Sequence, residues 1–293
     1  MEAIVTVVIP SYKRAHLLEQ TLPTYIQEGV KELILIDDCS PDNTAEVVRE
    51  LQKKYPQIKY IKQPRNMRQQ AAKNRGLDYV TTEWTYFGDD DSMLYPGTIK
   101  RLYDTCIENG VEACGAIAYY MNHGEEEMSL DAFIEKRQKY TDNIKDIVDI
   151  NKMYANFTYS VKCPIIVPFC QACILIKSSI AKKVKFDTLY TGNAYREETD
   201  FIIRCGAEGT IFMFDSRGAQ INLPSHMSTG GSRGNSVWKY KYYMIVNNWR
   251  FLQKNHKIIK AKYNVPYSKY RMQWDFICAF ITRPLKRFFN RFS

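Results

Sequence analysis

Three adjacent carboxylates, Asp89 to Asp91, follow Gly88 at the end of the short aromatic run from Trp84 to Phe87. We expect this run to be a β-strand, which places the acids at a strand's carboxyl end, where open α/β sheets bind ligands. Neighbouring carboxylates repel one another unless water or a cation neutralises them, and their oxygens suit a divalent cation that also binds phosphate. The competing interpretation is an ordinary acidic turn before the helix expected from residue 96.

Asp37 and Asp38 follow a second strand pattern, the apolar run over 33–36. Parallel strands end at the same edge of a sheet, so we expect Asp38 and the acids at 89–91 to face one crevice. The alternative is that Asp37 and Asp38 cap the turn that leads into the next helix.

Glu197, Glu198 and Asp200 stand in the first turn of a helix expected over 197–208. A carboxylate within hydrogen-bonding reach of a substrate hydroxyl can accept its proton during a transfer reaction, so this cluster is a candidate general base. The helix dipole also favours acids in a first turn, which is the purely structural interpretation.

The elements that would position these acids alternate along the chain. Apolar, β-branched runs predict strands, and apolar residues at helical spacing predict helices between them. Such alternation is typical of an α/β fold with a mostly parallel sheet. The expected strands cover residues 4–9, 33–36, 58–61, 84–87, 113–120, 169–176, 211–214 and 219–223, and the expected helices begin near residues 17, 46, 68, 96, 178, 197 and 237.

Charge is distributed unevenly along the 293 residues, whose formal net charge is +9. Residues 237–293 contain thirteen Lys or Arg and one acid, Asp275, which gives +12 and leaves −3 for residues 1–236. We therefore expect a catalytic domain over 1–236 and a basic, aromatic, helical extension over 237–293. Within the catalytic domain, the polar stretch 121–161 shows no clear hydrophobic periodicity, and we expect it to be an insertion that lies on the side of the site where the second substrate, the acceptor, binds.

The C-terminal extension mixes tryptophan, tyrosine and phenylalanine with lysine and arginine, and a proline is expected to interrupt its last part, 274–292. This composition fits contact with an anionic membrane surface, and packing of the aromatic face on the catalytic domain is the plainer alternative. Nucleic acid is not expected as a partner, because no recognition motif accompanies the basic residues.

The sequence favours a cytoplasmic protein that acts peripherally at the cytoplasmic face of a membrane. Residues 1–10 carry an acid where a signal peptide has basic residues, and no uninterrupted apolar stretch reaches the roughly 18 residues of a membrane span. Eight cysteines are scattered or lie in apolar stretches, which predicts buried, reduced thiols rather than a zinc site.

Five segments of the chain match the motif order of a known enzyme family. They are 9–14 (Ile-Pro-Ser-Tyr-Lys-Arg), 36–44 (Ile-Asp-Asp-Cys-Ser-Pro-Asp-Asn-Thr), 66–76 with Ala71, Asn74 and Arg75, 88–91 (Gly-Asp-Asp-Asp) and 196–201 (Arg-Glu-Glu-Thr-Asp-Phe). From about residue 5 to residue 233 the chain resembles a family 2 glycosyltransferase. The resemblance implies the GT-A fold, a Rossmann-like, mostly parallel α/β sheet flanked by helices.

The resemblance implies roles for individual residues of the donor and acceptor sites. Glu198 would be the catalytic base, with Glu197 and Asp200 as alternates, and Asp38 would contact the nucleobase. The residues implied in nucleotide binding are Pro10, Ser11, Tyr12, Arg14, Asp38, Arg75, Asp89, Asp90 and Arg233.

A divalent cation, Mn²⁺ or Mg²⁺, is implied at the family's DxD motif. Asp91 would bind the metal directly, and His226, in the late glycine-rich loop, would be an additional ligand. Many family members have an acid where this chain has Gly88. Which two aspartates form the pair therefore stays open, with Asp89 as an alternative ligand.

These roles imply an inverting, metal-dependent glycosyltransferase of the hexosyltransferase type. It would move a sugar from a nucleotide-diphosphate sugar, with UDP favoured, to a hydroxyl of a glycan or lipid-linked acceptor in surface polysaccharide synthesis. A nucleotidyltransferase would instead carry a glycine-rich, basic loop after the first strand, where only Lys13 and Arg14 are basic. A non-catalytic nucleotide-binding or scaffold protein would lack the metal or base carboxylates, and both sets are present.

Overall fold

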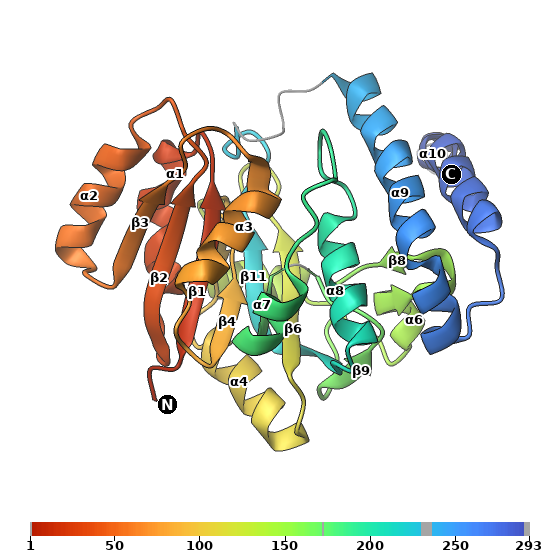
Figure 1. Cartoon of the computed structure of the whole chain (residues 1–293), viewed down its shortest axis with the longest axis horizontal. Helices are drawn as coiled ribbons and strands as arrows, with labels where there is room; N and C mark the ends of the chain where they lie inside the picture. The colour runs from red at the N-terminus through yellow and green to blue at the C-terminus, as the bar shows by residue number, and fades with distance from the viewer. Residues whose placement is uncertain (1, 172, 230–235, 290–293) are drawn as a thin grey trace.

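The structure is a computed structural model that describes residues 2–171, 173–229 and 236–289. Within these residues the centre is a nine-stranded sheet with strand order β3-β2-β1-β4-β10-β6-β11-β5, and β9 pairs with β11. Helices flank the sheet, as Figure 1 shows. The expected α/β fold, a mostly parallel sheet flanked by helices, is confirmed.

Four parallel strands form the N-terminal half of the sheet, and their carboxyl ends meet at one edge. Their side chains are largely apolar, and those of β1 and β4 are buried on both faces, as expected for a parallel sheet covered by helices. The strands are β1 (Val5–Ser11), β2 (Val30–Asp37), β3 (Ile58–Lys62) and β4 (Trp84–Phe87).

The other half of the sheet is mixed. β10 (Ile174–Lys177) is antiparallel to both β4 and β6 (Ala113–Tyr120), and β6 is parallel to β11 (Phe212–Asn222). β5 (Ser92–Leu94) and β9 (Ile165–Val167) each pair antiparallel with β11.

Two strand predictions in this half need correction. The strands expected at 211–214 and 219–223 are one strand, β11, whose register shifts between Asp215 and Ala219. The polar residues of this bulge resemble a turn in sequence, but Thr105 and Arg217 hydrogen-bond Asp215 and keep the strand continuous. The strand expected over 169–176 begins only at residue 174.

Helices cover the two faces of the sheet with separate apolar clusters. One face holds α1 (Ala15–Thr21), the 3₁₀ helix η1 (Leu22–Tyr25), α2 (Thr44–Lys54) and α4 (Thr98–Asn109). The opposite face holds α3 (Arg68–Tyr79), α7 (Ser178–Val184) and α8 (Glu197–Ala207). Neighbouring residues of one strand, such as Val7 and Val8, belong to different clusters because their side chains point to opposite faces.

The stretch 121–161 folds outside the main sheet. It contains α5 (Leu130–Arg137), α6 (Ile144–Ile147), the 3₁₀ helix η2 (Ile150–Lys152) and a separate pair of strands, β7 (Val148–Asp149) and β8 (Tyr154–Ala155). Phe133, Ile147 and Met153 are buried in the same apolar cluster as α8. The stretch therefore packs on the body of the protein through these side chains.

Two long helices end the described chain, α9 (Val237–Tyr263) and α10 (Lys269–Phe289). α9 packs between α8 and α10, at the right of Figure 1. α9 begins at residue 237, as expected, and continues to residue 263. α10 runs through Pro284, where an interruption was expected; a proline removes one helical hydrogen bond, and the helix is continuous despite that loss.

The contact between α9 and the rest of the protein is both apolar and polar. Phe251, Leu252 and Ile259 of α9 are buried in the cluster that contains α8. Three buried asparagines each donate to a different segment: Asn247 to the Thr191 carbonyl, Asn248 to Gln273 of α10, and Asn255 to Asp200 of α8. The C-terminal helices thus share one core with the sheet.

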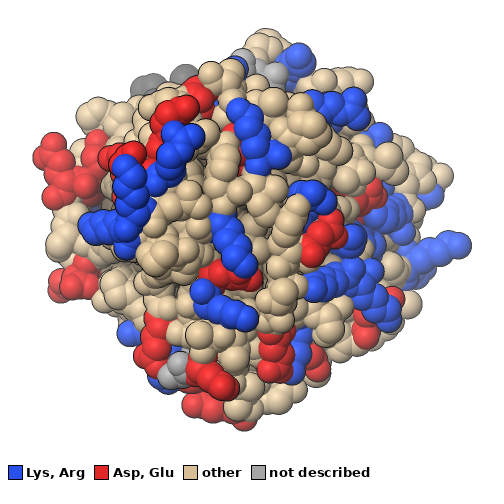
Figure 2. Space-filling model, turned by 60° about the vertical axis from the view of Figure 1, so that its left-hand side comes forward, with Lys and Arg blue, Asp and Glu red and all other residues tan. Residues whose placement is uncertain are grey.

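The surface carries both signs of charge. Figure 2, turned so that the side with α2 comes forward, shows basic and acidic side chains interspersed on that face. Among the described residues, none of the helices combines the length and the apolar character that crossing a bilayer requires.

We expect Phe251→Ala to destabilise the whole protein, because the Phe251 side chain is fully buried where α9 meets α8. Removing a buried phenylalanine costs about 3–5 kcal/mol of unfolding free energy, measured by denaturant unfolding. Tyr242→Ala is the matched control, since the Tyr242 side chain on the same helix is 62% exposed. A separate early transition for α9, with the main transition unchanged, would show instead that α9 folds independently.

Candidate functional site

A cavity of about 520 Å³ opens at the carboxyl ends of β1, β2 and β4. The acids after β4 and Glu198 of α8 line it together, as does Asp38. The structure therefore brings the three predicted acidic groups to one pocket. Its lining residues are Pro10, Ser11, Tyr12, Arg14, Asp38, Asn66, Arg68, Gln69, Asp89, Asp90, Asp91, Gly192, Asn193, Ala194 and Glu198.

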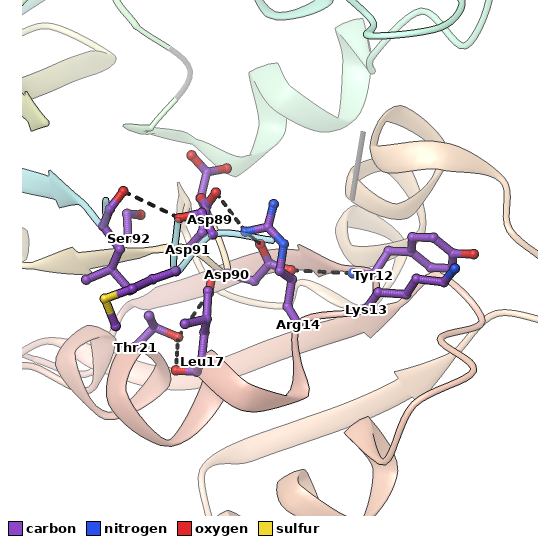
Figure 3. Close-up of polar contacts among 12 residues, drawn as sticks. Tyr12, Lys13, Arg14, Leu17, Thr21, Asp89, Asp90, Asp91 and Ser92 are labelled. Carbon is purple, nitrogen blue, oxygen red and sulfur yellow. Dashed lines mark hydrogen bonds and ion pairs between the residues drawn. The ribbon is translucent and has the colours of Figure 1, made fainter. Parts of the chain in front are cut away.

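Arg14 neutralises part of the acidic triplet, Asp89 to Asp91. Its Nη1 lies 2.7 Å from Asp91 Oδ2 and 3.7 Å from Asp90 Oδ1, and the backbone N–H of Tyr12 donates to Asp90 at 3.4 Å (Figure 3). Burial nevertheless raises the pKa of the Asp90 carboxyl to about 7, with Arg14 acting in the opposite direction. Burial and Arg14 thus act in opposite directions on the Asp90 carboxyl.

Asp89 is held from several sides. The Cys173 thiol donates to its Oδ2 at 3.2 Å, and Gln220 Nε2 donates to the same oxygen at 3.4 Å. The Tyr25 hydroxyl donates to the Asp89 carbonyl at 3.0 Å. Burial raises the pKa of the Asp89 carboxyl, and the Lys73 ammonium opposes that effect.

Tyr25 also explains the glycine before the triplet. A Cβ atom at Gly88 would lie 2.6 Å from Tyr25 Cε1 and 3.1 Å from Ile9 Cγ1, which is too close for any side chain. The position where many members of the resembled family have an acid is therefore closed in this chain.

A divalent cation fits the charge of the triplet but would need ligands from outside the protein. Among the described residues, no group of three or more His, Cys, Asp or Glu side chains is arranged to hold a metal ion. Magnesium sites of enzymes often use one or two carboxylates, with substrate phosphates and water completing the shell. The carboxyl groups of Asp90 and Asp91 line the pocket and fit a site of that type.

The structure does not bring two other predicted residues to the pocket. His226 Nε2 lies 3.2 Å from Glu126 Oε1, and its ring is 4.5 Å from that of His123, so it contacts the 121–161 stretch. Arg75 points away from the cavity and donates to the Tyr79 hydroxyl at 2.7 Å. Arg233 lies outside the described residues.

Asp38 both lines the pocket and anchors the start of α3. Its Oδ1 accepts hydrogen bonds from Gln63 at 2.8 Å and from the Met67 N–H at 2.6 Å, and its Oδ2 accepts from the Arg68 N–H at 2.7 Å. Burial raises the pKa of this carboxyl, while the backbone donors act against the rise. Asp37 instead bonds to the Ser40 N–H and the Tyr60 hydroxyl, within the turn.

The two adjacent glutamates of α8 have different surroundings. Glu198 lines the pocket, its side chain is 34% exposed, and Lys73 Nζ donates to its Oε1 at 2.6 Å. Glu197 is buried and accepts a hydrogen bond from Gln69. Burial raises the pKa of the Glu197 carboxyl to about 8, and the nearby Glu198 carboxylate adds to the rise although Lys73 opposes it. The Glu197 carboxyl therefore holds its proton more readily than a solvated glutamate does.

Asp200 is fully buried and makes four hydrogen bonds. Its Oδ1 accepts from the Tyr190 hydroxyl and Asn255, and its Oδ2 accepts from Arg204 and Lys254, all between 2.7 and 3.1 Å. Four donors occupy the acceptor capacity of a carboxylate. Asp200 thus joins α8 to α9 and to the preceding loop, away from the cavity.

Sequence reasoning missed Lys73, Gln69, Asn66, Arg68 and the loop 192–194. Lys73 had a visible signal: it stands one turn from Gln69 and from Leu77, on the stripe of α3 that includes Gly76. A lysine on the stripe that faces the sheet must find a buried partner. The loop 192–194 had no such signal, because its position depends on contacts with α9.

Comparison with known proteins identifies related sequences. The profile described as Glycosyl transferase family 2 matches residues 6–184. A GalNAc(5)-diNAcBac-PP-undecaprenol beta-1,3-glucosyltransferase of Campylobacter jejuni is 34% identical over 113 residues, which is 38% of this chain and 37% of that protein. The poly(ribitol-phosphate) beta-N-acetylglucosaminyltransferase TarP of Staphylococcus aureus is 26% identical over 90% of this chain and 74% of its own length. The alignments to the first three curated relatives span only 18 to 37% of their lengths.

Solved structures share the fold. The mannosyltransferase PcManGT of Pyrobaculum calidifontis, in complex with GDP-Man and Mn²⁺, aligns with a TM-score of 0.61 at 14% identity, over 97% of this chain and 76% of that chain. S. aureus TarS 1-349, in complex with UDP-GlcNAc, aligns with a TM-score of 0.57 at 15% identity, over 93% of this chain and 69% of that chain. These likenesses concern the fold, and they agree with the GT-A architecture expected from the sequence.

We expect Asp200→Asn to lower stability rather than to abolish proton transfer. The amide leaves part of a buried, four-donor network unpaired, at a cost on the order of 3–5 kcal/mol of unfolding free energy, measured by denaturant unfolding. Asp142→Asn is the control, because the Asp142 side chain is 78% exposed and paired only at the surface. Unchanged stability with lost turnover would instead identify Asp200 as a catalytic group.

Proposed function

The chain belongs to glycosyl transferase family 2, and from that premise we propose that it transfers a sugar from a nucleotide-diphosphate sugar to a hydroxyl of a glycan or lipid-linked acceptor. The observation that carries the proposal is the shared pocket, in which Glu198 faces the same cavity as the acidic triplet. Transfer needs stabilisation of a departing diphosphate at one side of the sugar and a base for the acceptor at the other.

For the departing diphosphate we propose a bound Mn²⁺ or Mg²⁺, held by Asp91 together with Asp89 or Asp90. When bound, the cation supplies neutralisation of the charge that develops on the leaving group. Arg14, already within 2.7 Å of Asp91, orients that carboxylate and adds positive charge at the same wall. The roles implied for His226 and Arg233 by the family resemblance stay predictions.

For the acceptor we propose Glu198 as the general base. It lines the cavity and its side chain is partly exposed, whereas Glu197 and Asp200 are buried. A carboxylate can take the hydroxyl proton as the new bond forms. Attack from the side opposite the diphosphate inverts the configuration at the anomeric carbon, so we propose an inverting transferase.

We favour UDP as the donor nucleotide, with Asp38 and the loop 10–14 lining its site. TarS, one of the structural neighbours, has been captured with UDP and UDP-GlcNAc, although PcManGT holds GDP-Man. For the acceptor, the names of two relatives specify an undecaprenol-linked glycan and poly(ribitol-phosphate). These relatives support a surface polymer as the acceptor class, with the 121–161 stretch on the acceptor side of a catalytic domain over 1–236.

We also propose that the extension over 237–293 contacts an anionic membrane from the cytoplasmic side. Tyr270 and Trp274, one turn apart on α10, are 67% and 63% exposed. Lys269 Nζ lies 5.5 Å from the centre of the Tyr270 ring, and the segment carries +12 in the sequence. Exposed rings among cations suit the interface of anionic lipid, where a lipid-linked acceptor would be found.

Glu198→Gln tests the transfer reaction. With a panel of nucleotide sugars and Mn²⁺ or Mg²⁺, we expect the unaltered protein to release nucleoside diphosphate and the variant to lose about 100-fold or more in kcat. We expect UDP to raise the melting temperature of the variant as it does that of the unaltered protein, since the substitution keeps the shape of the side chain.

Glu83→Gln is the matched control variant, because Glu83 also pairs with a lysine at 2.6 Å but at the surface. Near-normal turnover by Glu198→Gln would remove Glu198 from the role.

Tyr270→Ser with Trp274→Ser tests the membrane contact. We expect the unaltered protein to cosediment with phosphatidylcholine–phosphatidylglycerol vesicles at low salt and the double variant to remain largely in the supernatant. The control carries Tyr140→Ser with Ile166→Ser, which remove side chains that are 60% and 62% exposed elsewhere. Absence of cosedimentation by the unaltered protein at low salt would contradict the proposal.

A further inference from the structure

Lys73 is a buried cation that sequence analysis did not connect with the reaction. Its side chain is 1% exposed, and it contacts Glu198, which lines the pocket. Nζ donates to Glu198 Oε1 at 2.6 Å, lies 4.0 Å from Glu197 Oε1, and stands 5.1 Å from the centre of the Phe186 ring. A buried ammonium group that is not hydrated needs negatively charged or hydrogen-bonding partners from the protein, because burying an unpaired charge is costly.

Three carboxyl groups surround the Lys73 ammonium, those of Glu198, Glu197 and Asp89. Burial lowers the pKa of Lys73, but these groups outweigh that effect, and the pKa lies above its ordinary value. Lys73 is therefore positively charged. Glu198 is its closest partner, since Glu198 Oε1 lies 2.6 Å from Nζ and Glu197 Oε1 lies 4.0 Å away.

The contact engages one oxygen of Glu198, a residue that lines the pocket. Lys73 binds Oε1; within the described residues, Oε2 accepts no hydrogen bond from the protein. A glutamate side chain at a helix start has several rotamers, and a 2.6 Å contact with a buried, immobile ammonium selects one of them. The free oxygen then has a defined position.

α3 supplies this contact from a helix whose start is itself fixed. Asp38 accepts the N–H groups of Met67 and Arg68 at the first turn, and Gln69 and Lys73, one turn apart, then hold Glu197 and Glu198. A helix rises about 1.5 Å per residue, so the Asp38 end and the Glu198 end of the pocket are joined by a rigid spacer of a little more than one turn.

We propose that Lys73 is a positioning residue for glycosyl transfer, which fixes the Glu198 carboxylate in one orientation toward the acceptor hydroxyl. The inference rests on the proposed role of Glu198 as the base. Lys73 touches neither donor nor acceptor in this arrangement. Its loss therefore affects the transfer step more than donor binding.

Lys73→Met removes the ammonium while it keeps most of the side-chain volume. We expect kcat to fall about ten-fold or more, because small displacements of a catalytic group are costly, while KM for the donor changes little. Lys177→Met is the control, since Lys177 also pairs with a glutamate at 2.6 Å, at the surface.

A folded Lys73→Met protein with unchanged kcat, or one whose kcat is normal while its donor KM rises, would overturn the inference. If the single variant does not fold, Lys73→Met with Glu197→Gln removes the buried ammonium and the buried acid together, which is better tolerated than breaking the pair, and the same two measurements decide. The two proposals are tested by different outcomes. An active Glu198→Gln protein would contradict the role of Glu198 as general base. An inactive Glu198→Gln protein together with a Lys73→Met protein of normal activity would contradict only the positioning role of Lys73.

Discussion

Charge compensation by two buried cations is the constraint on which the pocket depends. Asp89 to Asp91, Glu197 and Glu198 form a concentration of acids that no fold tolerates without counter-charges. Arg14 meets the triplet from the loop after β1, and Lys73 meets the glutamates from α3. In the proposed reaction, the triplet would hold the metal ion that neutralises the diphosphate, and Glu198 would accept the proton of the acceptor hydroxyl.

The parallel half of the sheet explains why these groups meet. β1, β2 and β4 end at one edge, so the loops that follow them converge without long connections. α3 then crosses from the Asp38 end to the Glu198 end, because Asp38 holds its first turn and Lys73 lies further along the helix. In the proposed reaction, the same helix, α3, would therefore contact both the donor site at Asp38 and the acceptor site at Glu198.

The strands and the acids at their ends were predictable because strands covered on both faces leave continuous apolar runs in the sequence. The resemblance already favoured Glu198 over its neighbours. The fold adds a physical reason against Asp200, because donors that include Asn255 of α9 occupy its carboxylate. Lys73 escaped notice because a lysine in a helix is normally solvated. Arg75, two residues on, illustrates the opposite error: it lies on the outer side of α3, which a motif match does not reveal.

The three buried asparagines of α9 have a consequence for assembly of the chain. An apolar helix can shift along its groove at little cost in free energy. A shift of α9 by one turn, about 5.4 Å, would leave the side-chain amides of Asn247, Asn248 and Asn255 without hydrogen-bond partners. The correct docking is therefore selected by polar groups rather than by hydrophobic contact alone. Because the Asn247 contact also fastens the loop before α8, an α9 seated out of register would deform the rim of the cavity as well.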